Sequence, residues 1–373
     1  MSVPETPAVL FRTPLHALHI ALGAKMVPFA GYELPLHYAA GVVREHLHTR
    51  AAAGLFDVSH MGQIRLTGNL HALERLCPLD MSVLRPGQQR YTFFTNESGG
   101  ILDDLMVSRV GDHLVLIVNA SRKQIDAAHL RQHLANECIV EELSQRALLA
   151  LQGPAAAAVL ARLAPDCARL LFMTGAWFAI AGAECYVTRS GYTGEDGFEL
   201  SVPADKAESL ARALLAHAEV APIGLGARDS LRLEAGMCLY GHDIDTATTP
   251  IEANLAWAIA KSRRVGVGED GFPGAENILA QLRNGVACKR MGLMPDGKIP
   301  VREGAQLQSA DRSIVGRVTS GGFSPTLNRP IAIGYVNTTA AIPGSMLTTT
   351  VRDKPITLRV VHLPFVTPRY HRG

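Results

Sequence analysis

The apolar and polar residues in the first half of the chain follow a pattern typical of strands and one helix. Apolar and polar side chains alternate over residues 63–67, 91–95 and 101–108, which predicts half-buried strands, and the mostly apolar run 113–118 predicts a more buried one. A helical stretch follows to about residue 134, and we expect Ser121 to cap its N-terminus. This order of elements indicates an α+β fold.

A second unit begins near residue 146. Residues 146–151 predict a strand that ends at Gly153, and an Ala-rich helix is expected to start at Pro154, because proline is favourable at the first helical position. Further strands are predicted on both sides of a glycine-rich segment, and two more helices follow them. The predicted strands cover 185–189 and 198–202, and the predicted helices cover 204–217 and 227–235.

The last third of the chain has a different composition. Beyond about residue 282 the apolar runs are short, Gly and Pro recur every few residues, and Thr and Val replace Ala and Leu, which predicts a separate β-rich domain. We expect the linker within residues 261–274. Residues 266–271 match the dinucleotide fingerprint G-x-G-x-x-G, but no strand is predicted before them and no helix after them. We therefore interpret them as a flexible linker.

Length and composition are typical of a soluble globular protein with two or three domains. The chain has 373 residues, of which 47% are hydrophobic and 19% charged, and its net charge of +2 without a long basic run argues against nucleic-acid binding. The longest apolar stretch, 147–161, is interrupted by Gln152, Gly153 and Pro154, so we expect no membrane span. The N-terminal residues resemble neither a signal peptide nor a transit peptide, and we expect a cytoplasmic protein.

Sequence motifs for several other chemistries are absent. The chain has no G-x-S-x-G nucleophile elbow and no Walker lysine, so hydrolase and kinase-like reactions lack support. Four histidines lie close together in the sequence but lack the helical spacing and the glutamate of a zincin site, and no metal is expected. These are His37, His46, His48 and His60.

Two adjacent acids, Asp103 and Asp104, interrupt an otherwise apolar strand. Successive strand residues face opposite sides, so one carboxylate should enter the interior or a cleft while the other faces out. Burying a carboxylate without a partner would cost several kcal/mol, so the inward one should be paired or functional. The alternative is an acid pair at a turn edge that caps neighbouring amides.

The glycine-rich segment 189–199 combines three glycines with Tyr192 and three acids, which would let the backbone approach a ligand closely. Tyr192 could stack on a flat ring. Glu199, inside the following strand, offers two acceptors to a donor-donor edge such as that of a pterin or guanine. A tight turn with a solvated acid is the alternative.

Arg228 and Arg232 are four residues apart and should share one face of a short helix, with Asp229 and Glu234 nearby. Arg228, beside two glycines, could form a bidentate pair with a carboxylate. A purely structural ion-pair network is the competing interpretation, and it suits Arg232 better than Arg228.

Ordered motifs along nearly the whole chain resemble the family of glycine cleavage T proteins. They lie at residues 13–16, 23–32, 54–62, 99–105, 191–199, 226–236, 239–243, 319–325 and 363–366. The resemblance implies a three-domain cloverleaf around a folate-binding cavity, with a ferredoxin-like domain and a C-terminal β-barrel. It implies a folate-binding region over residues 1–282, made of two interleaved domains with boundaries near 60, 146 and 228, and a barrel over 283–373.

The resemblance also implies a reaction, an aminomethyl transfer. The aminomethyl group held on the reduced lipoyl arm of the H protein passes to tetrahydrofolate, the co-substrate, and the products are 5,10-methylenetetrahydrofolate, ammonia and dihydrolipoyl H protein. A folate amine must attack an iminium-like carbon while water is kept away, so we expect a dry cavity that a long arm can reach. We expect no nucleic-acid or membrane partner, and a monomer or weak oligomer.

Residue roles follow from the same resemblance. Asp104 aligns with the family's important aspartate, which is expected to interact with the folate amines and assist attack, whereas Asp103 would be structural. Glu199 aligns with the glutamate that binds the pterin edge, and Arg228 with a binding arginine. The other implied pocket residues are Met61, Tyr91, Asn119, Tyr192 and Tyr370.

Two other folate-binding proteins are the nearest alternatives. The C-terminal module of a dimethylglycine or sarcosine dehydrogenase would need a flavin domain, which the chain lacks. A folate-binding protein of iron-sulfur cluster maintenance carries the motif K-G-C-Y-x-G-Q-E, which is absent from the comparable residues 234–242. A non-enzymatic scaffold would require a degenerate pocket, and its principal polar positions are filled.

Overall fold

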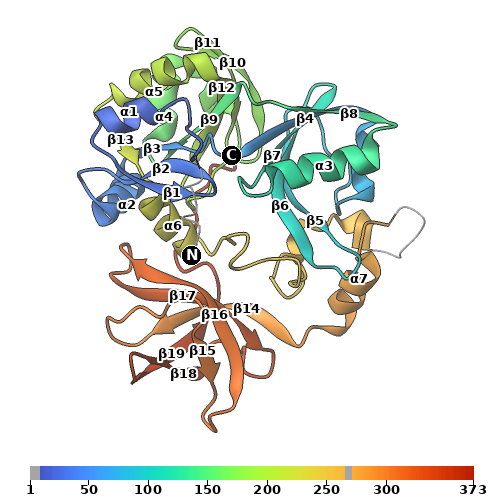
Figure 1. Cartoon of the computed structure of the whole chain (residues 1–373), viewed down its shortest axis with the longest axis vertical. Coiled ribbons are helices and arrows are strands. Elements are labelled where there is room, and N and C mark those ends of the chain that lie inside the picture. Colours follow the sequence, from blue (N-terminus) through green and yellow to red (C-terminus); the bar gives the residue numbers. More distant parts are fainter. Residues whose placement is uncertain (1–8, 265–270) are drawn as a thin grey trace, which may run out of the picture.

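The computed structural model of the chain describes residues 9–264 and 271–373. Three lobes surround a common centre (Figure 1), and each lobe is built on its own sheet. The predicted α+β class with a C-terminal β-barrel is confirmed by this arrangement. Residues 266–270 of the dinucleotide-like motif, and with residue 265 the middle of the linker predicted over 261–274, lie outside the described residues.

The first lobe contains a mixed six-stranded sheet in which β3 and β13 are parallel and the other neighbours antiparallel. In spatial order its strands are β10 (Gly175–Ile180), β11 (Ala183–Thr188), β12 (Gly197–Pro203), β9 (Arg146–Gln152), β3 (Ala53–Asp57) and β13 (Val220–Ile223). A separate hairpin joins β1 (Lys25–Phe29) to β2 (Tyr32–His37). The α-helices of this lobe are α1 (His16–Ala21), α2 (Val42–Ala51), α4 (Ala156–Leu163), α5 (Ala207–Leu215) and α6 (Leu225–Glu234).

The second lobe contains an antiparallel five-stranded sheet. In spatial order its strands are β5 (Gln89–Thr95), β6 (Ile101–Val110), β7 (His113–Val118), β4 (Gly62–Gly68) and β8 (Cys138–Glu142). The helix α3 (Lys123–Leu134) packs its apolar residues against one face of this sheet, which explains the alternating burial of β6. Buried and half-buried residues therefore alternate along β6 as the sequence pattern predicts.

The third lobe is a closed antiparallel barrel. Around the barrel its strands are β14 (Cys288–Pro295), β17 (Arg329–Asn337), β16 (Ile314–Ser324), β15 (Gln306–Gln308), β18 (Met346–Val351) and β19 (Lys354–Val361). The predicted β-rich C-terminal part is confirmed. The helix α7 (Ala275–Asn284) precedes the barrel and packs with Phe93 and Ile101 of the second lobe.

Short 3-10 helices connect these elements. They are η1 (Leu70–Arg75), η2 (Pro165–Arg169), η3 (Ala204–Lys206), η4 (Ala256–Ala258) and η5 (Lys261–Arg264). Two predicted helix starts are wrong. The helix α3 begins two residues after Ser121, behind Arg122, and no side chain caps it. The helix α4 begins at Ala156 rather than Pro154, because residues 154 and 155 form a turn.

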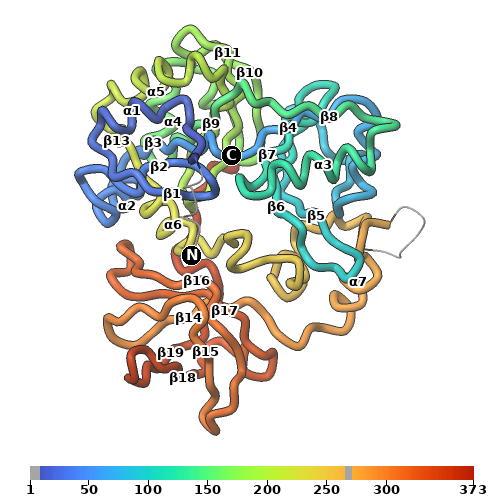
Figure 2. Tube along the Cα trace, viewed as in Figure 1, coloured from blue at the N-terminus to red at the C-terminus, as the bar shows by residue number. Residues whose placement is uncertain are grey.

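The chain visits the first lobe twice, and Figure 2 shows the trace leaving it and returning. The strand β3 ends at Asp57, residues 62–142 then build the sheet of the second lobe, and β9 re-enters the first sheet beside β3. On this path we propose domain boundaries near 60, 146, 228 and 283. The same return places the sheets of the first two lobes on either side of the common centre (Figure 1).

Candidate functional site

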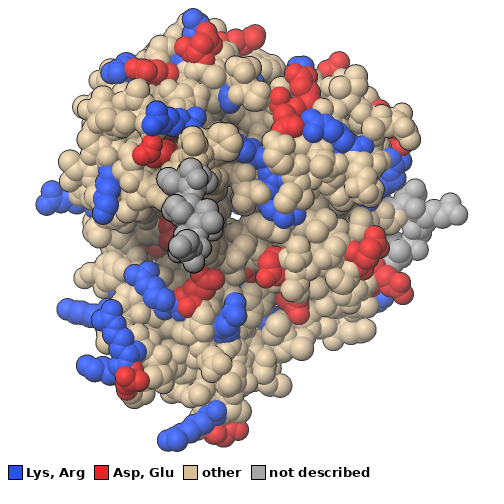
Figure 3. All heavy atoms as spheres, viewed as in Figure 1, with Lys and Arg blue, Asp and Glu red and all other residues tan. Residues whose placement is uncertain are grey.

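A cavity of about 1390 Å³ lies where the three lobes meet. Figure 3 shows the molecule hollowed at this junction, with Lys and Arg side chains beside the opening. A cavity that binds one small molecule typically measures roughly 300–1,000 Å³, so this one has room for a large ligand and a second reactive group. Side chains from the sheets of the first and second lobes, from α6 and from the barrel line it.

All eight residues that the family resemblance implies lie at this cavity. They are Met61, Tyr91, Asp104, Asn119, Tyr192, Glu199, Arg228 and Tyr370. They come from strands, loops, one helix and the C-terminal tail, and only the meeting of the lobes brings them together.

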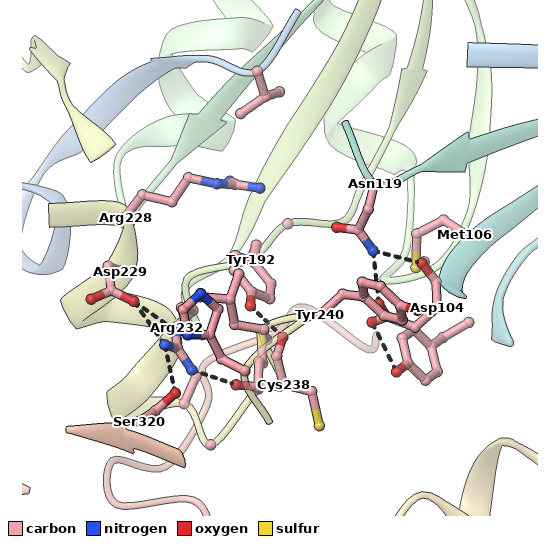
Figure 4. Close-up of a pocket in the computed structure, with 18 of the residues that line it drawn as sticks. Asp104, Met106, Asn119, Tyr192, Arg228, Asp229, Arg232, Cys238, Tyr240 and Ser320 are labelled. Carbon is pink, nitrogen blue, oxygen red and sulfur yellow. Dashed lines mark hydrogen bonds and ion pairs between the residues drawn. The ribbon is translucent and has the colours of Figure 1, made fainter. Parts of the chain in front are cut away.

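Asp104 is held at the cavity wall by two hydrogen bonds. The Asn119 side-chain amide donates to Oδ1 at 2.8 Å and the Tyr91 hydroxyl donates to Oδ2 at 3.0 Å (Figure 4). Burial raises the pKa of Asp104 to about 7, the charge of Asp103 adds to this rise, and the two hydrogen bonds oppose it. The carboxyl can therefore gain or lose a proton near neutral pH, as acid-base catalysis requires.

Asp103 lies on the opposite face of β6 and is fully buried. It accepts hydrogen bonds from the Asn119 backbone N–H at 3.1 Å and from the Asn119 side-chain amide at 2.9 Å. The two acids lie on opposite faces of β6 as predicted, but the expectation that one of them faces out is wrong, because Asp103 enters the interior and Asp104 faces the central cavity. Both acids lie inside β6, so the alternative of a turn-edge pair is wrong.

Glu199 and Arg228 approach the cavity from the first lobe. The Ser190 hydroxyl donates to Oε2 of Glu199 at 3.3 Å, and burial raises the pKa of this carboxyl while Arg228 and Ser190 lower it. The guanidinium carbon of Arg228 lies 4.8 Å from the ring centre of Tyr192, and the Arg228 guanidinium forms no hydrogen bond or ion pair within residues 9–264 and 271–373. The pair presents one acceptor group and one free donor group to a ligand.

Arg232 is fixed by a buried ion-pair network instead. Its guanidinium donates to Asp243 at 2.7 Å, to Asp229 at 2.9 Å and to the Ser320 hydroxyl at 3.0 Å. The structural interpretation of Arg232 is confirmed, and the acids that pair with it are these two aspartates. One helix turn away, Arg228 points into the cavity (Figure 4).

Several cavity residues gave no signal in the sequence. Trp257 stacks on Tyr91 at 5.2 Å and is 64% exposed, but its apolar surroundings in the sequence look like a core segment. Arg290 of β14 is buried and donates to the carbonyls of Ala253 and Gly236, both at 2.9 Å. Only the fold places these side chains at the cavity.

The C-terminal tail is held at the cavity by aromatic stacking. The ring of Tyr370 lies parallel to that of Phe172 at 4.0 Å, and the guanidinium of Arg372 lies 5.1 Å from the Phe172 ring centre. These contacts explain how a residue of the C-terminal tail comes to line the central cavity.

Replacing Glu199 by alanine is expected to weaken tetrahydrofolate binding by about 10- to 100-fold, because an ionised acceptor contributes about 1.5–3 kcal/mol per hydrogen bond. Isothermal titration calorimetry would measure the dissociation constant. The exposed Glu184 on the neighbouring strand β11 provides a control, since Glu184→Ala should leave the affinity unchanged. Equal affinities for Glu199→Ala and the wild type would remove Glu199 from the ligand site.

The described residues contain neither a metal-ligand cluster nor a membrane-spanning helix. No group of three or more His, Cys, Asp or Glu side chains among them is placed to hold a metal ion. No helix in residues 9–264 or 271–373 has the length and apolar character needed to cross a membrane.

Sequence families and known structures match this architecture along almost the whole chain. The GCVT N-terminal domain matches residues 15–263, and the glycine cleavage T-protein C-terminal barrel domain matches residues 289–367. The mitochondrial aminomethyltransferase of Mus musculus is 46% identical over 374 residues, covering 97% of this chain and 92% of the mouse protein. The mitochondrial aminomethyltransferase of Dictyostelium discoideum is 43% identical over 383 residues, covering 97% of this chain and 94% of that protein.

A solved structure is similar to the same extent. The crystal structure of glycine cleavage system aminomethyltransferase T from Bartonella henselae superposes with a TM-score of 0.91 at 45% sequence identity. The match covers 97% of this chain and 100% of that one.

Proposed function

The chain belongs to the family of glycine cleavage T proteins and is a tetrahydrofolate-dependent aminomethyltransferase, and we propose that Asp104 is the acid-base group of its central cavity. The observation that supports this role is a carboxyl with a pKa raised to about 7 by burial, at the wall of a cavity that also carries Glu199 and Arg228. A buried acid with this pKa is typical of catalytic sites.

The hydrogen balance of the reaction explains why such a group is needed. The one-carbon unit arrives as an S–CH₂–NH₂ group on a reduced lipoyl arm and ends between two nitrogens of tetrahydrofolate. Each of these nitrogens gives up one hydrogen, and the two hydrogens end on ammonia and on the lipoyl sulfur. Asp104 can take a proton from an attacking folate amine and return it to a departing group, because neither of its protonation states is strongly disfavoured near pH 7.

The remaining cavity residues support binding of the folate. Among the described residues only Ser190 donates a hydrogen bond to the Glu199 carboxylate, so the other lone pairs of this carboxylate can accept from the donor-donor edge of a pterin. We propose Arg228 and Tyr192 as a further binding group, with the ring stacked on the folate and the guanidinium donating to it. Met61, Tyr91, Asn119 and Tyr370 complete the proposed binding site.

The lipoyl-carrying H protein of the glycine cleavage system is the proposed partner. The volume of the cavity, about 1390 Å³, supports simultaneous entry of a folate and a lipoyl arm. We further propose a monomer or weak oligomer, which sedimentation would test. We also propose a cytoplasmic location. The relatives named above are mitochondrial, and cell fractionation would distinguish the two locations.

The experiment that tests the function follows both products. Tetrahydrofolate and aminomethyl-loaded H protein are incubated with the chain, and 5,10-methylenetetrahydrofolate and ammonia are measured in parallel. Equal amounts of the two products, dependent on the chain, are expected. Folate binding without either product would assign the chain to a relative that uses folate differently.

Turnover is expected to depend on pH through Asp104. If the carboxylate accepts the proton, its ionised fraction falls about tenfold for each pH unit below its pKa of about 7, and turnover falls with it. The rate of ammonia release at saturating substrates, measured from pH 5 to pH 9, should therefore rise towards a plateau with a midpoint near 7. A rate that is constant over this range would exclude Asp104 as the proton acceptor.

A further inference from the structure

A third buried carboxyl lies behind the two aspartates of β6. Asp126, on the first turn of α3, is 1% exposed, and Asp103 is 0% exposed. The carboxyls of Asp103 and Asp126 are within hydrogen-bonding reach of each other. Oδ2 of Asp126 is buried and receives no hydrogen bond from any donor in the described part of the chain.

Two carboxylates cannot hydrogen-bond to each other unless one of them carries a proton, because an ionised carboxyl has only acceptors. Two negative charges in contact in a dry interior would also repel strongly, and buried acid pairs therefore retain one proton between them. One shared proton satisfies the contact between Asp103 and Asp126 and leaves a single negative charge on the pair.

This pair is connected to the cavity by one side chain. The Asn119 amide donates both to Asp103 Oδ1, at 2.9 Å, and to Asp104 Oδ1, at 2.8 Å. The order of groups from the interior to the cavity is therefore Asp126, Asp103, Asn119 and Asp104. A change of charge on Asp103 acts on Asp104 through this short, buried path.

We propose that Asp103 and Asp126 share one proton and that Asp126 is a positioning residue, which keeps one negative charge behind Asn119 and so controls the protonation of Asp104. The proposal deepens the function given above, and its kinetic test depends on that function. It assigns a chemical role to Asp126, a residue of a helix that does not line the cavity, and to Asp103, which would otherwise only support the fold.

Other charged and titratable groups face this pair from the elements around it. Burial raises the pKa of Asp126, while its hydrogen bond with Asp103 and the charge of Arg122 oppose this rise. Arg122 lies at the start of α3, with its guanidinium carbon 5.4 Å from the Tyr240 ring centre. Burial and Asp126 together raise the pKa of Asp103. Burial raises the pKa of Tyr91, Cys238 and Tyr240. The charge of Asp104 adds to this rise at Tyr91 and Cys238, and the charge of Asp245 adds to it at Tyr240.

The variant Asp126→Asn separates three possibilities. Its amide donates to Asp103, which then needs no proton and becomes fully ionised beside Asn119. Under the proposal, the midpoint of the rise of turnover with pH moves up by about one pH unit. If both acids were ionised in the wild type, removing one charge would move the midpoint down. A purely structural role would lower turnover at every pH with the midpoint unchanged, and either of these two results would overturn the proposal.

Asp112→Asn is the matched control, since Asp112 lies in the turn between β6 and β7 with a 95% exposed side chain. It removes one aspartate charge from the same sheet and should leave the midpoint within about 0.2 pH units of the wild type, because solvent screens an exposed charge. Thermal melting of both variants establishes that they are folded.

A second measurement uses the wild-type protein and needs no activity. Aspartate labelled with ¹³C at the side-chain carboxyl allows its titration to be followed by NMR, with Asp126→Asn and Asp103→Asn used for assignment. Sharing predicts that the two resonances change together in two steps, with one proton retained at pH 7. Independent titration of both carboxyls below pH 5 would refute the shared proton even if the aminomethyl transfer itself were absent.

Discussion

Replacing Asp104 by asparagine is expected to lower turnover by about 10²- to 10⁴-fold, the usual contribution of a positioned acid-base group. Asparagine has nearly the same shape, and its single carbonyl oxygen can still accept from the Asn119 amide, which donates to Asp104 at 2.8 Å. The Tyr91 hydroxyl, which donates to the other carboxylate oxygen at 3.0 Å, can rotate and accept from the new amide N–H. Tetrahydrofolate affinity should therefore change by less than about tenfold. Single-turnover ammonia release and calorimetric folate binding would measure the two effects separately.

The comparison of these two effects decides the role of Asp104. Equal losses of turnover and affinity would mean that its carboxylate binds the folate ground state and does not take part in proton transfer. Asp112→Asn again serves as the control for the loss of one aspartate charge, and it should keep both values. An unchanged turnover in Asp104→Asn would contradict the proposed mechanism altogether.

Replacing Glu234 by alanine is expected to lower the free energy of unfolding by about 3–5 kcal/mol. The Glu234 carboxylate is fully buried at the end of α6 and accepts from Arg50 of α2 at 2.8 Å and from His46 at 3.1 Å. Ser324, the last residue of β16 in the barrel, and Thr326, which follows this strand, donate to it as well. The variant would leave the buried Arg50 with Glu195, at 2.7 Å, as its remaining carboxylate within the network.

Chemical unfolding followed by circular dichroism would measure this loss, with Glu208→Ala as the control. Glu208 forms an exposed ion pair with Arg212 at 2.7 Å on α5, and such surface pairs contribute only about 0–1 kcal/mol. A loss in Glu234→Ala as small as in Glu208→Ala would show that the network does not hold α2, α6 and the barrel together.

Much of the second lobe could be predicted from the sequence, because its signals are local. The alternation over residues 101–108 persists in β6, where one face packs under α3 and the other faces the cavity. The helix starts predicted from Ser121 and Pro154 are wrong because a local signal was not sufficient at these positions. Each is a favourable residue type for a helix start, but the path of the chain into the helix decides which residue begins it.

The candidate site could be predicted only in part. The family resemblance supplied the eight cavity positions. The residues alone suggested one of the two acids Asp103 and Asp104, together with Tyr192, Glu199 and Arg228, and left an alternative open for each motif. Asp126 gave no signal, since a polar residue near the start of a helix is usually an exposed or capping group. Its contact with Asp103 depends on the packing of α3 on the sheet, which no local pattern contains.

The chain enters the first lobe twice, and this order of strands has a consequence for the synthesis of the protein. The strand β3 leaves the ribosome early, but its neighbours β9 and β13 begin only at Arg146 and Val220. Residues 62–142 contain every strand of the second sheet and can close it first. Until β9 is made, the residues of β3 that are buried in the folded protein remain unpaired in the nascent chain. Slow translation before residue 146 would therefore prolong the time in which these residues can aggregate or bind chaperones.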